Sequence, residues 1–195
     1  MLKQKLKGYK IILASGSPRR QQFFKDLDLD FEIRLKEVEE IYPPEMKGRE
    51  ITDYLAQLKA AAFEMIGTEE LLVTSDTIVW HEGKALGKPK DYEDAVRILQ
   101  ALSGSTHEVI TSVCFKSRNK TEVIHDITKV TFCDLSPEAI KYYLDNYTPY
   151  DKAGAYGIQD WIGFVAVSKI EGSYTNVMGL PTEKVYNYLI KLEDK

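Results

Sequence analysis

From Glu50 to Ile66 the apolar side chains recur at the spacing of one helix face, and this pattern constrains the fold most strongly. The spacing i, i+3, i+4, i+7 is kept throughout and predicts an amphipathic helix over this range. The apolar positions are Ile51, Tyr54, Leu55, Leu58, Ala61, Ala62, Met65 and Ile66.

Short β-branched or alternating segments before and after this helix predict strands. They cover residues 10–14, 31–35, 71–75, 78–81, 106–116, 121–133 and 163–170. Glu82-Gly83 indicates a tight hairpin turn, and the prolines of residues 37–46 indicate a loop. Strands and helices are interspersed without a strict βαβ order, so we expect an α/β or α+β fold with a mixed sheet.

Start signals predict further helices. Ser17-Pro18 combines a capping residue with a proline at the first helical position and predicts a helix to about Leu27. Equivalent signals predict helices from Asp91 to Leu102, from Ser136 to Asn146 and from Pro181 to Leu192.

Composition narrows the class of protein. The 195 residues hold 26 Lys and Arg against 30 Asp and Glu, a net charge of −4, which argues against nucleic acid bound along a general basic surface. The length fits one domain, or two fused lobes, and the apolar runs are too short to span a membrane. The basic start is followed by too short an apolar stretch for a signal peptide, so we expect a cytoplasmic protein.

Cysteine and histidine spacing gives no sign of a disulfide framework or a zinc site. Cys114 and Cys133 each lie in an apolar segment and are expected to be buried thiols. His81, His107 and His125 are far apart and have no partner at zinc-site spacing.

The segment Ser15-Gly16-Ser17-Pro18-Arg19-Arg20 lies between a predicted strand and a predicted helix. Glycine allows close backbone approach, and free N–H groups at a helix start favour an anion. Arginine in a first turn opposes the helix dipole, so a negative group is expected nearby. The alternative is that Arg19 and Arg20 are solvated or paired with Glu37, Glu39 or Glu40.

Three more segments carry groups suited to phosphate chemistry. Asp76 follows an apolar strand and could bind a divalent cation or accept a proton, although an aspartate that caps a turn is a common alternative. Lys59 lies beside small alanines in the Glu50–Ile66 helix, and Lys88 is held next to Pro89; both could equally be solvated. Together these groups favour phosphate-ester or anhydride chemistry on a metal-bridged polyphosphate.

The segment from Asp151 to Gln159 is a loop of small residues with an aspartate, a lysine and a glutamine. An amide presents one donor and one acceptor side and could read the edge of a base. Tyr150, Tyr156 and Tyr174 could stack on a base, but packing is the commoner role of aromatic residues.

Seven ordered segments resemble the Maf family of nucleotide pyrophosphatases. They are LASGSPRR (13–20), LAQLKA (55–60), SDTIV (75–79), GKP (87–89), LSGSTH (102–107), DKAGAYGIQ (151–159), and GSY (172–174) with GLP (179–181). The resemblance runs from about residue 10 to the C-terminus. It implies an elongated mixed sheet flanked by helices, two lobes with a cleft, and in many members a homodimer.

The resemblance also implies hydrolysis of a nucleoside triphosphate between the α and β phosphates with a divalent metal, Mg²⁺, Mn²⁺ or Co²⁺. Carried over by position, Asp76 is the proton acceptor and Glu40 helps Asp76 to hold the metal. The triphosphate is bound by Ser15, Arg19, Arg20, Lys59 and Lys88.

Arg19, Thr77 and Gln159 match the positions at which the subgroups of the family differ. They resemble the dTTP/UTP-hydrolysing subgroup rather than the 7-methyl-GTP one. Asp160-Trp161 departs from the glycine usual after Gln159, which puts the shape of the base pocket in question. His107 also matches a family position, but we interpret it as a hydrogen-bonded structural residue.

Two alternatives to a dTTP/UTP pyrophosphatase remain open. A nucleotide-binding regulator of cell division would bind in the same site with little turnover. A pyrophosphatase for another modified nucleotide would keep the phosphate chemistry and change the base pocket.

Overall fold

The fold is a mixed α/β arrangement, seen in a computed structural model that describes residues 2–64 and 66–192. Its strands are β1 Lys10–Leu13, β2 Phe31–Ile33, β3 Glu70–His81, β4 Lys84–Leu86, β5 Thr106–Lys116, β6 Thr121–Phe132 and β7 Val167–Glu171. Its helices are α1 Leu2–Lys5, α2 Pro18–Asp26, α3 Arg49–Ala61, α4 Tyr92–Leu102, α5 Pro137–Tyr147, α6 Trp161–Ala166, α7 Tyr174–Val177 and α8 Thr182–Ile190, with a 3₁₀ turn at Ala153–Ala155.

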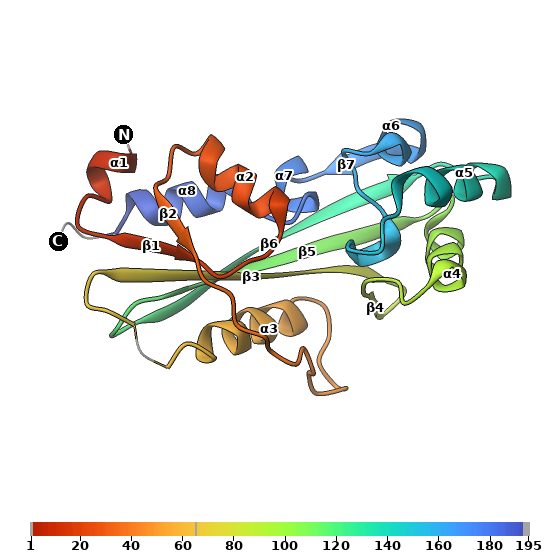
Figure 1. Cartoon of the computed structure of the whole chain (residues 1–195). Helices are drawn as coiled ribbons and strands as arrows, with labels where there is room; N and C mark the ends of the chain where they lie inside the picture. Colours follow the sequence, from red (N-terminus) through yellow and green to blue (C-terminus); the bar gives the residue numbers. More distant parts are fainter. Residues whose placement is uncertain (1, 65, 193–195) are drawn as a thin grey trace. The chain divides into compact units, whose positions relative to one another are not determined.

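The strands of the described residues form a seven-stranded sheet in the order β2-β1-β3-β5-β6-β7, with β4 paired to β3 (Figure 1). β1 runs parallel to β2 and β3, whereas β4 is antiparallel to β3 and β7 is antiparallel to β6. The predicted mixed sheet flanked by helices is therefore confirmed.

The chain divides into two compact units. The first comprises the described residues of Met1–Asp76, Thr111–Asp126 and Gly179–Lys195, and the second comprises Thr77–Ile110 and Ile127–Met178. Strands β3, β5 and β6 each contribute residues to both units.

In the first unit, the alternation of side chains along β1 and β3 builds two apolar layers. Ile11, Leu13, Leu71 and Val73 pack with α1, α2 and α8, whereas Ile12 and Leu72 pack with α3. Figure 1 shows α1, α2 and α8 on one side of β1 and β3, and α3 on the other. The sheet is covered on both faces in this unit.

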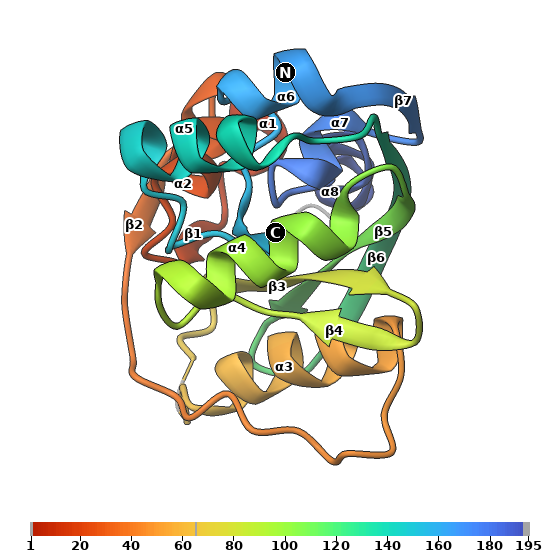
Figure 2. The same ribbon diagram turned by 90° about the vertical axis from the view of Figure 1, so that its right-hand side faces the viewer.

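In the second unit, α4, α5, α6 and the 3₁₀ turn share one apolar cluster with β3, β5 and β6. Leu99 of α4, Tyr143 of α5 and Ile162 of α6 are each fully buried in it. Figure 2 shows α4 beside β3, and the short strand β4 paired along the end of β3. Glu82 and Gly83 both have positive φ and form the predicted two-residue hairpin turn between these strands.

Two capping predictions are confirmed at the level of atoms. The Asp91 side chain accepts a hydrogen bond from the N–H of Asp94 at 2.8 Å, and the Ser136 side chain accepts one from Ala139 at 3.2 Å. Ser17 is at the N-cap of α2 with Pro18 after it, but its side chain makes no capping hydrogen bond.

Three predicted boundaries are wrong. Residues 71–81 form one continuous strand, so Asp76 lies inside β3 and not beyond its end. The predicted Glu50–Ile66 helix is shorter in the structure and ends at Ala61, where Lys116 Nζ donates hydrogen bonds to the carbonyls of Ala60 and Phe63. Met65, which belongs to the predicted apolar face, lies outside the described residues.

The predicted strand 163–170 is the third. Its first part belongs to helix α6, in which Ile162 and Ala166 are buried four residues apart, and only Val167–Glu171 forms a strand.

The predicted burial of Cys133 is also wrong. Cys114 is buried as expected, but Cys133 is exposed, because it follows the buried Phe132 and alternation turns its side chain outward.

Within residues 2–64 and 66–192, no helix is long and apolar enough to cross a membrane.

Gly154 and Gly83 offer a matched test of packing in the second unit. Both have positive φ, but an added Cβ at Gly154 would come within 2.6 Å of Val79 Cγ2, whereas at Gly83 it would meet nothing within 4 Å. We expect Gly83→Ala to cost about 1–2 kcal/mol through backbone strain alone, and Gly154→Ala to cost a further 1–3 kcal/mol, roughly, through overpacking. Urea unfolding measures both free energies, and equal losses would contradict the assigned contact.

Candidate functional site

Asp76 projects from β3 towards α3. Side chains on one face of a strand alternate, so Leu72, Thr74 and Asp76 share a face. Leu72 packs against Ala56 and Ala60 of α3, and the Thr74 hydroxyl donates to the carbonyl of Ala56 at 2.6 Å. The small alanines let α3 approach the strand closely, which brings the next polar position of the strand within reach of the helix side chains.

Lys59 of α3 meets Asp76 at this position. Its Nζ lies 2.7 Å from Asp76 Oδ1 and 2.9 Å from Glu40 Oε1, so one ammonium joins two carboxylates. The Asp76 side chain is 7% exposed and the Glu40 side chain 49% exposed. Burial of an unpaired carboxylate is costly, and Lys59 offsets that cost.

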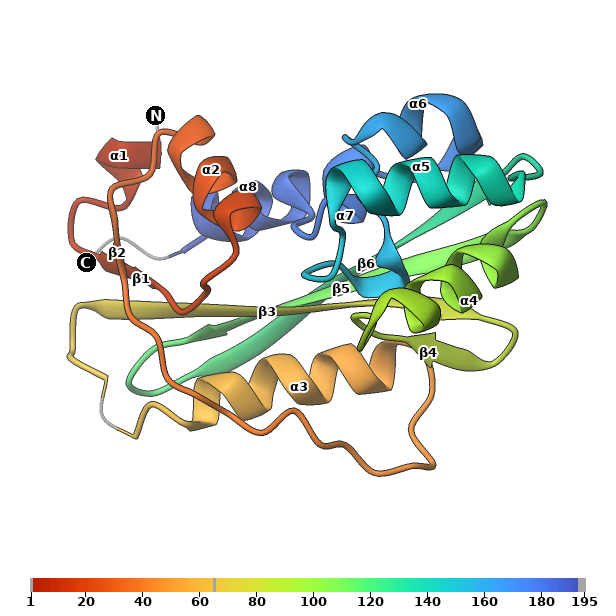
Figure 3. The ribbon, with the colours of Figure 1, turned by 45° about the vertical axis from the view of Figure 1, so that its right-hand side comes forward.

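Glu40 comes from the long connection between β2 and α3. Figure 3 shows this connection running alongside α3. The connection therefore brings a solvent-facing carboxylate to the buried one on β3. The alternative that Asp76 caps a turn is wrong, because Asp76 lies within a strand and forms an ion pair with Lys59.

Arg20 approaches Asp76 from α2. Its Nε donates to the carbonyl of Gly179 at 2.8 Å and its Nη1 donates to the carbonyl of Ser75 at 3.0 Å. Burial lowers the pKa of the Arg20 guanidinium, and Arg19 acts in the same direction, whereas Asp76 and Glu40 raise it. Arginine keeps its charge despite such shifts, so Arg20 is a fixed cation beside Asp76.

The Ser15–Ser17 loop lies at the start of α2. Ser15 is buried; its Oγ accepts a hydrogen bond from the N–H of Ser17 at 3.3 Å and its carbonyl accepts one from Gln21 at 3.1 Å. The first turn of α2 holds no acidic side chain, but it does hold Arg19 and Arg20. The first unit contains Ser15, Arg19, Arg20, Glu40, Lys59 and Asp76, and within this set Lys59 contacts both Glu40 and Asp76. The predicted anion site and the predicted carboxylate site share this unit.

The remaining predicted residues, Thr77, Lys88 and Gln159, belong to the second unit. The N–H of Gly154 donates to the carbonyl of Gly87 at 3.0 Å, which ties the 151–160 loop to the segment that carries the exposed Lys88. Gln159 is half-buried at the end of the same loop.

Tyr156 cannot stack on a base, because it is buried and its hydroxyl is 2.8 Å from His107 Nε2. The structural interpretation of His107 is therefore confirmed. Burial, reinforced by nearby His81, lowers the pKa of His107 from 6.5 to about 4, so this histidine is neutral at physiological pH.

Sequence reasoning missed the groups that orient the candidate residues within each unit. The carbonyls of Ser75 and Gly179 hold Arg20, and Tyr143 holds the 151–160 loop from helix α5. Backbone carbonyls leave no trace in residue type. Tyr143 reads only as an apolar position of a helix, so no local signal could have found its role.

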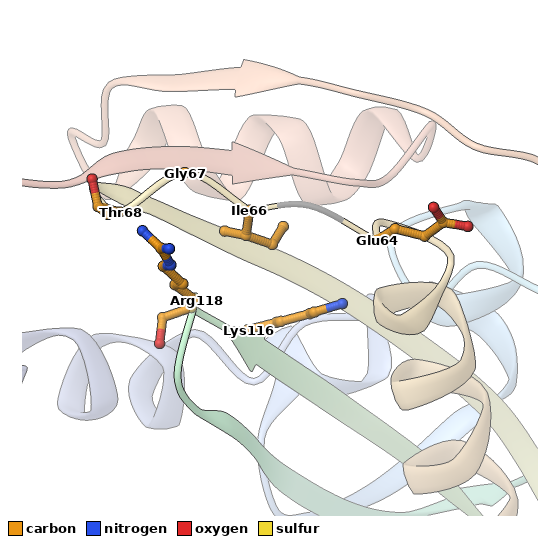
Figure 4. Close-up of a pocket in the computed structure, with 7 residues that line it drawn as sticks. Glu64, Ile66, Gly67, Thr68, Lys116 and Arg118 are labelled. Carbon is orange, nitrogen blue, oxygen red and sulfur yellow. The ribbon is translucent and has the colours of Figure 1, made fainter.

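A cavity of about 510 Å³ lies elsewhere in the first unit (Figure 4). Two of its lining residues, Lys116 and Arg118, are cationic. The full lining is Glu64, Ile66, Gly67, Thr68, Lys116, Ser117 and Arg118. None of the predicted site residues lines it, and Lys116 is already bonded to the end of α3. We therefore assign the candidate site to the Asp76 region and not to this cavity.

The model of Maf-like proteins matches residues 10–192. This chain belongs to the Maf family. Curated relatives agree over nearly the full length. A protein of Flavobacterium johnsoniae is 72% identical over 98% of this chain and 100% of its own, and one of Flavobacterium psychrophilum is 69% identical over 97% and 98%. A third, of Christiangramia forsetii, is 52% identical over 97% of both chains. All three carry the name dTTP/UTP pyrophosphatase.

His107 makes the stability of this Maf protein depend on pH. Below about pH 6.5 the unfolded chain binds a proton that the folded chain accepts only near pH 4, so protons favour unfolding across this range. We expect His107 to remove about 3 kcal/mol of folding free energy between pH 7 and pH 4. Chemical unfolding of wild type and His107→Gln at several pH values measures this term. The variant should show the flatter profile, and parallel profiles would contradict a buried neutral histidine.

Proposed function

We propose that this Maf protein hydrolyses dTTP and UTP between the α and β phosphates, giving the nucleoside monophosphate and pyrophosphate. The observation that carries the proposal is the Asp76 carboxylate, buried in β3 and flanked by the cations Lys59 and Arg20. The names of the relatives support the choice of substrate. The match across both units supports one Maf-like domain over residues 1–195.

In this proposal Asp76 accepts a proton from the attacking water. The oxygen of that water forms a bond to the α-phosphorus. The bond from the α-phosphorus to the oxygen that bridges the α and β phosphates breaks, and pyrophosphate leaves with that bridging oxygen. A carboxylate within hydrogen-bond reach of the water is the usual general base for such a step. Lys59 orients Asp76 through the 2.7 Å ion pair.

The cations offset the charge that develops on the leaving pyrophosphate. Arg20 is held in place by two carbonyls, so little reorganisation accompanies binding. We propose that Arg19, Lys59 and Lys88 also contact the triphosphate, and that Ser15 and the start of α2 bind a phosphate oxygen.

Glu40 and Asp76 suit a divalent metal. Both supply carboxylate oxygens to the same Lys59 ammonium, and hard cations such as Mg²⁺ take one or two carboxylates together with substrate phosphates. In the part of the chain that the structure describes, no group of three or more His, Cys, Asp or Glu side chains could hold a metal by itself. We propose that Glu40 and Asp76 would hold Mg²⁺, Mn²⁺ or Co²⁺ together with the triphosphate, and that the bound metal would offset phosphate charge.

We propose that Gln159 and Thr77 select the base from the second unit. Gln159 would pair with the donor and acceptor edge of thymine or uracil. We also propose that the protein acts on the nucleotide pool of the cytoplasm and that it forms a homodimer. The alternative function is that of a nucleotide-binding regulator with little turnover.

Asp76→Asn tests the proposal. The amide keeps the shape but cannot accept the proton as a carboxylate does, so we expect pyrophosphate release from dTTP and UTP to fall at least about 100-fold. The assay uses Mg²⁺, Mn²⁺, Co²⁺ or no metal. Glu45→Gln, at an exposed position of the β2–α3 connection, is the matched control and should keep wild-type activity.

An active Asp76→Asn variant would show that the base is another group. Tight binding of triphosphates by the wild type without any product would instead support the regulatory alternative.

A further inference from the structure

Tyr143, fully buried in α5, bonds to both ends of one short segment. Its hydroxyl accepts a hydrogen bond from the N–H of Gly157 at 3.0 Å and donates one to Asp160 Oδ2 at 2.9 Å. Burial raises the pKa of Tyr143, so the hydroxyl keeps the proton that it donates. One rigid ring thus connects the residues on either side of Ile158 and Gln159.

Asp160 departs from the usual behaviour of an aspartate at its position. It is the N-cap of α6, where an aspartate side chain normally accepts hydrogen bonds from the first helical N–H groups. Here its side chain makes no capping hydrogen bond and turns back to Tyr143, with Lys152 Nζ 3.8 Å from the same oxygen. A capping interaction is lost and the loop gains an anchor, a pattern typical of functional sites.

Gly157 brings this anchor next to Gln159. An added Cβ on Gly157 would lie 2.5 Å from Asp160 Oδ2 and 2.9 Å from Gln159 Nε2, so both side chains pack over the glycine. The NH₂ end of an amide carries partial positive charge and is favoured on the side of a carboxylate. Asp160 therefore favours one of the two orientations of the Gln159 amide.

Amide orientation matters for base selection. Uracil and thymine present an N3–H donor and an O4 acceptor, whereas cytosine presents an N3 acceptor and an N4 donor. A glutamine that is free to flip can satisfy either pattern, because its amide has one donor end and one acceptor end. A glutamine held in one orientation accepts one base and leaves unpaired groups opposite the other.

We propose that Tyr143 and Asp160 are positioning residues that hold the Gln159 amide in the orientation that selects uracil and thymine over cytosine. This inference rests on the proposed function and deepens it. It assigns a role to Asp160, the residue that departs from the family pattern.

The test compares Tyr143→Phe and Asp160→Asn with wild type in kcat/KM for UTP and for CTP. Phenylalanine keeps the buried ring and removes both hydrogen bonds, and asparagine keeps the shape and removes the charge. We expect the UTP-to-CTP ratio of kcat/KM to fall about tenfold in each, the change that one lost hydrogen bond produces. The KM for UTP should rise, with kcat within about a factor of three, because the phosphate-binding residues are untouched.

Three comparisons isolate the effect. Asp145→Asn removes an exposed carboxylate that pairs with Lys141 on the same helix and should leave the ratio unchanged. Asp160→Glu, which keeps the charge, should retain more of the ratio than Asp160→Asn. Amide hydrogen exchange at Gly157 should speed up in Tyr143→Phe, because its acceptor is lost.

An unchanged UTP-to-CTP ratio in both variants of a selective enzyme would overturn the inference and leave the proposed function intact. A uniform loss for every nucleotide would do the same, because it would assign Tyr143 and Asp160 a structural role alone. Absence of pyrophosphate release from every triphosphate by the wild type would overturn the proposed function itself, and this inference with it. The assay of the wild type alone therefore distinguishes failure of the proposed function from failure of this inference.

Discussion

The ion pair between Lys59 and Asp76 allows a carboxylate to lie inside a buried strand, and the candidate site depends on it. A strand interior is costly for a charge unless an opposite charge and hydrogen bonds replace its water. Lys59 of α3 supplies the opposite charge, with its Nζ 2.7 Å from Asp76 Oδ1, and Arg20 of α2 adds a second cation. Helix α3 packs on the face of β3 that carries Asp76, and Arg20 reaches the same strand from α2 through the Ser75 carbonyl.

The packing of α3 and the backbone contacts of Arg20 set the positions of the two cations relative to Asp76. Ala56 and Ala60 are fully buried, and their small size sets how closely α3 approaches β3. Two backbone carbonyls accept hydrogen bonds from Arg20, so the backbone of β3 and of the segment before α8 helps to set its position. The second unit uses the same principle, in that Tyr143 fixes a loop through its backbone N–H and one carboxylate.

Periodicity and capping predicted most of the fold, since the hairpin β5–β6 and helices α4 and α5 depend on local signals. The errors arise where tertiary contacts override such signals. The polar run from Thr74 to Thr77 was interpreted as a strand end, but the ion pair with Lys59 allows Asp76 to lie inside the strand. Phe164 and Val165 are strand-forming residues, yet they belong to α6, which buries Ile162 and Ala166 against the second-unit cluster. The candidate site residues were proposed through the family resemblance, whereas the contacts of Tyr143 and the carbonyls around Arg20 required coordinates.

A double-mutant cycle on the unfolding free energy tests the central claim, the dependence of Asp76 on Lys59, most directly. It compares wild type, Lys59→Met, Asp76→Asn and the double variant. We expect the two sites to be coupled by roughly 1–3 kcal/mol, because either single change removes the 2.7 Å ion pair and leaves the other charge without that partner. Additive effects within experimental error would show that Asp76 is stable in β3 without Lys59, and would contradict the account.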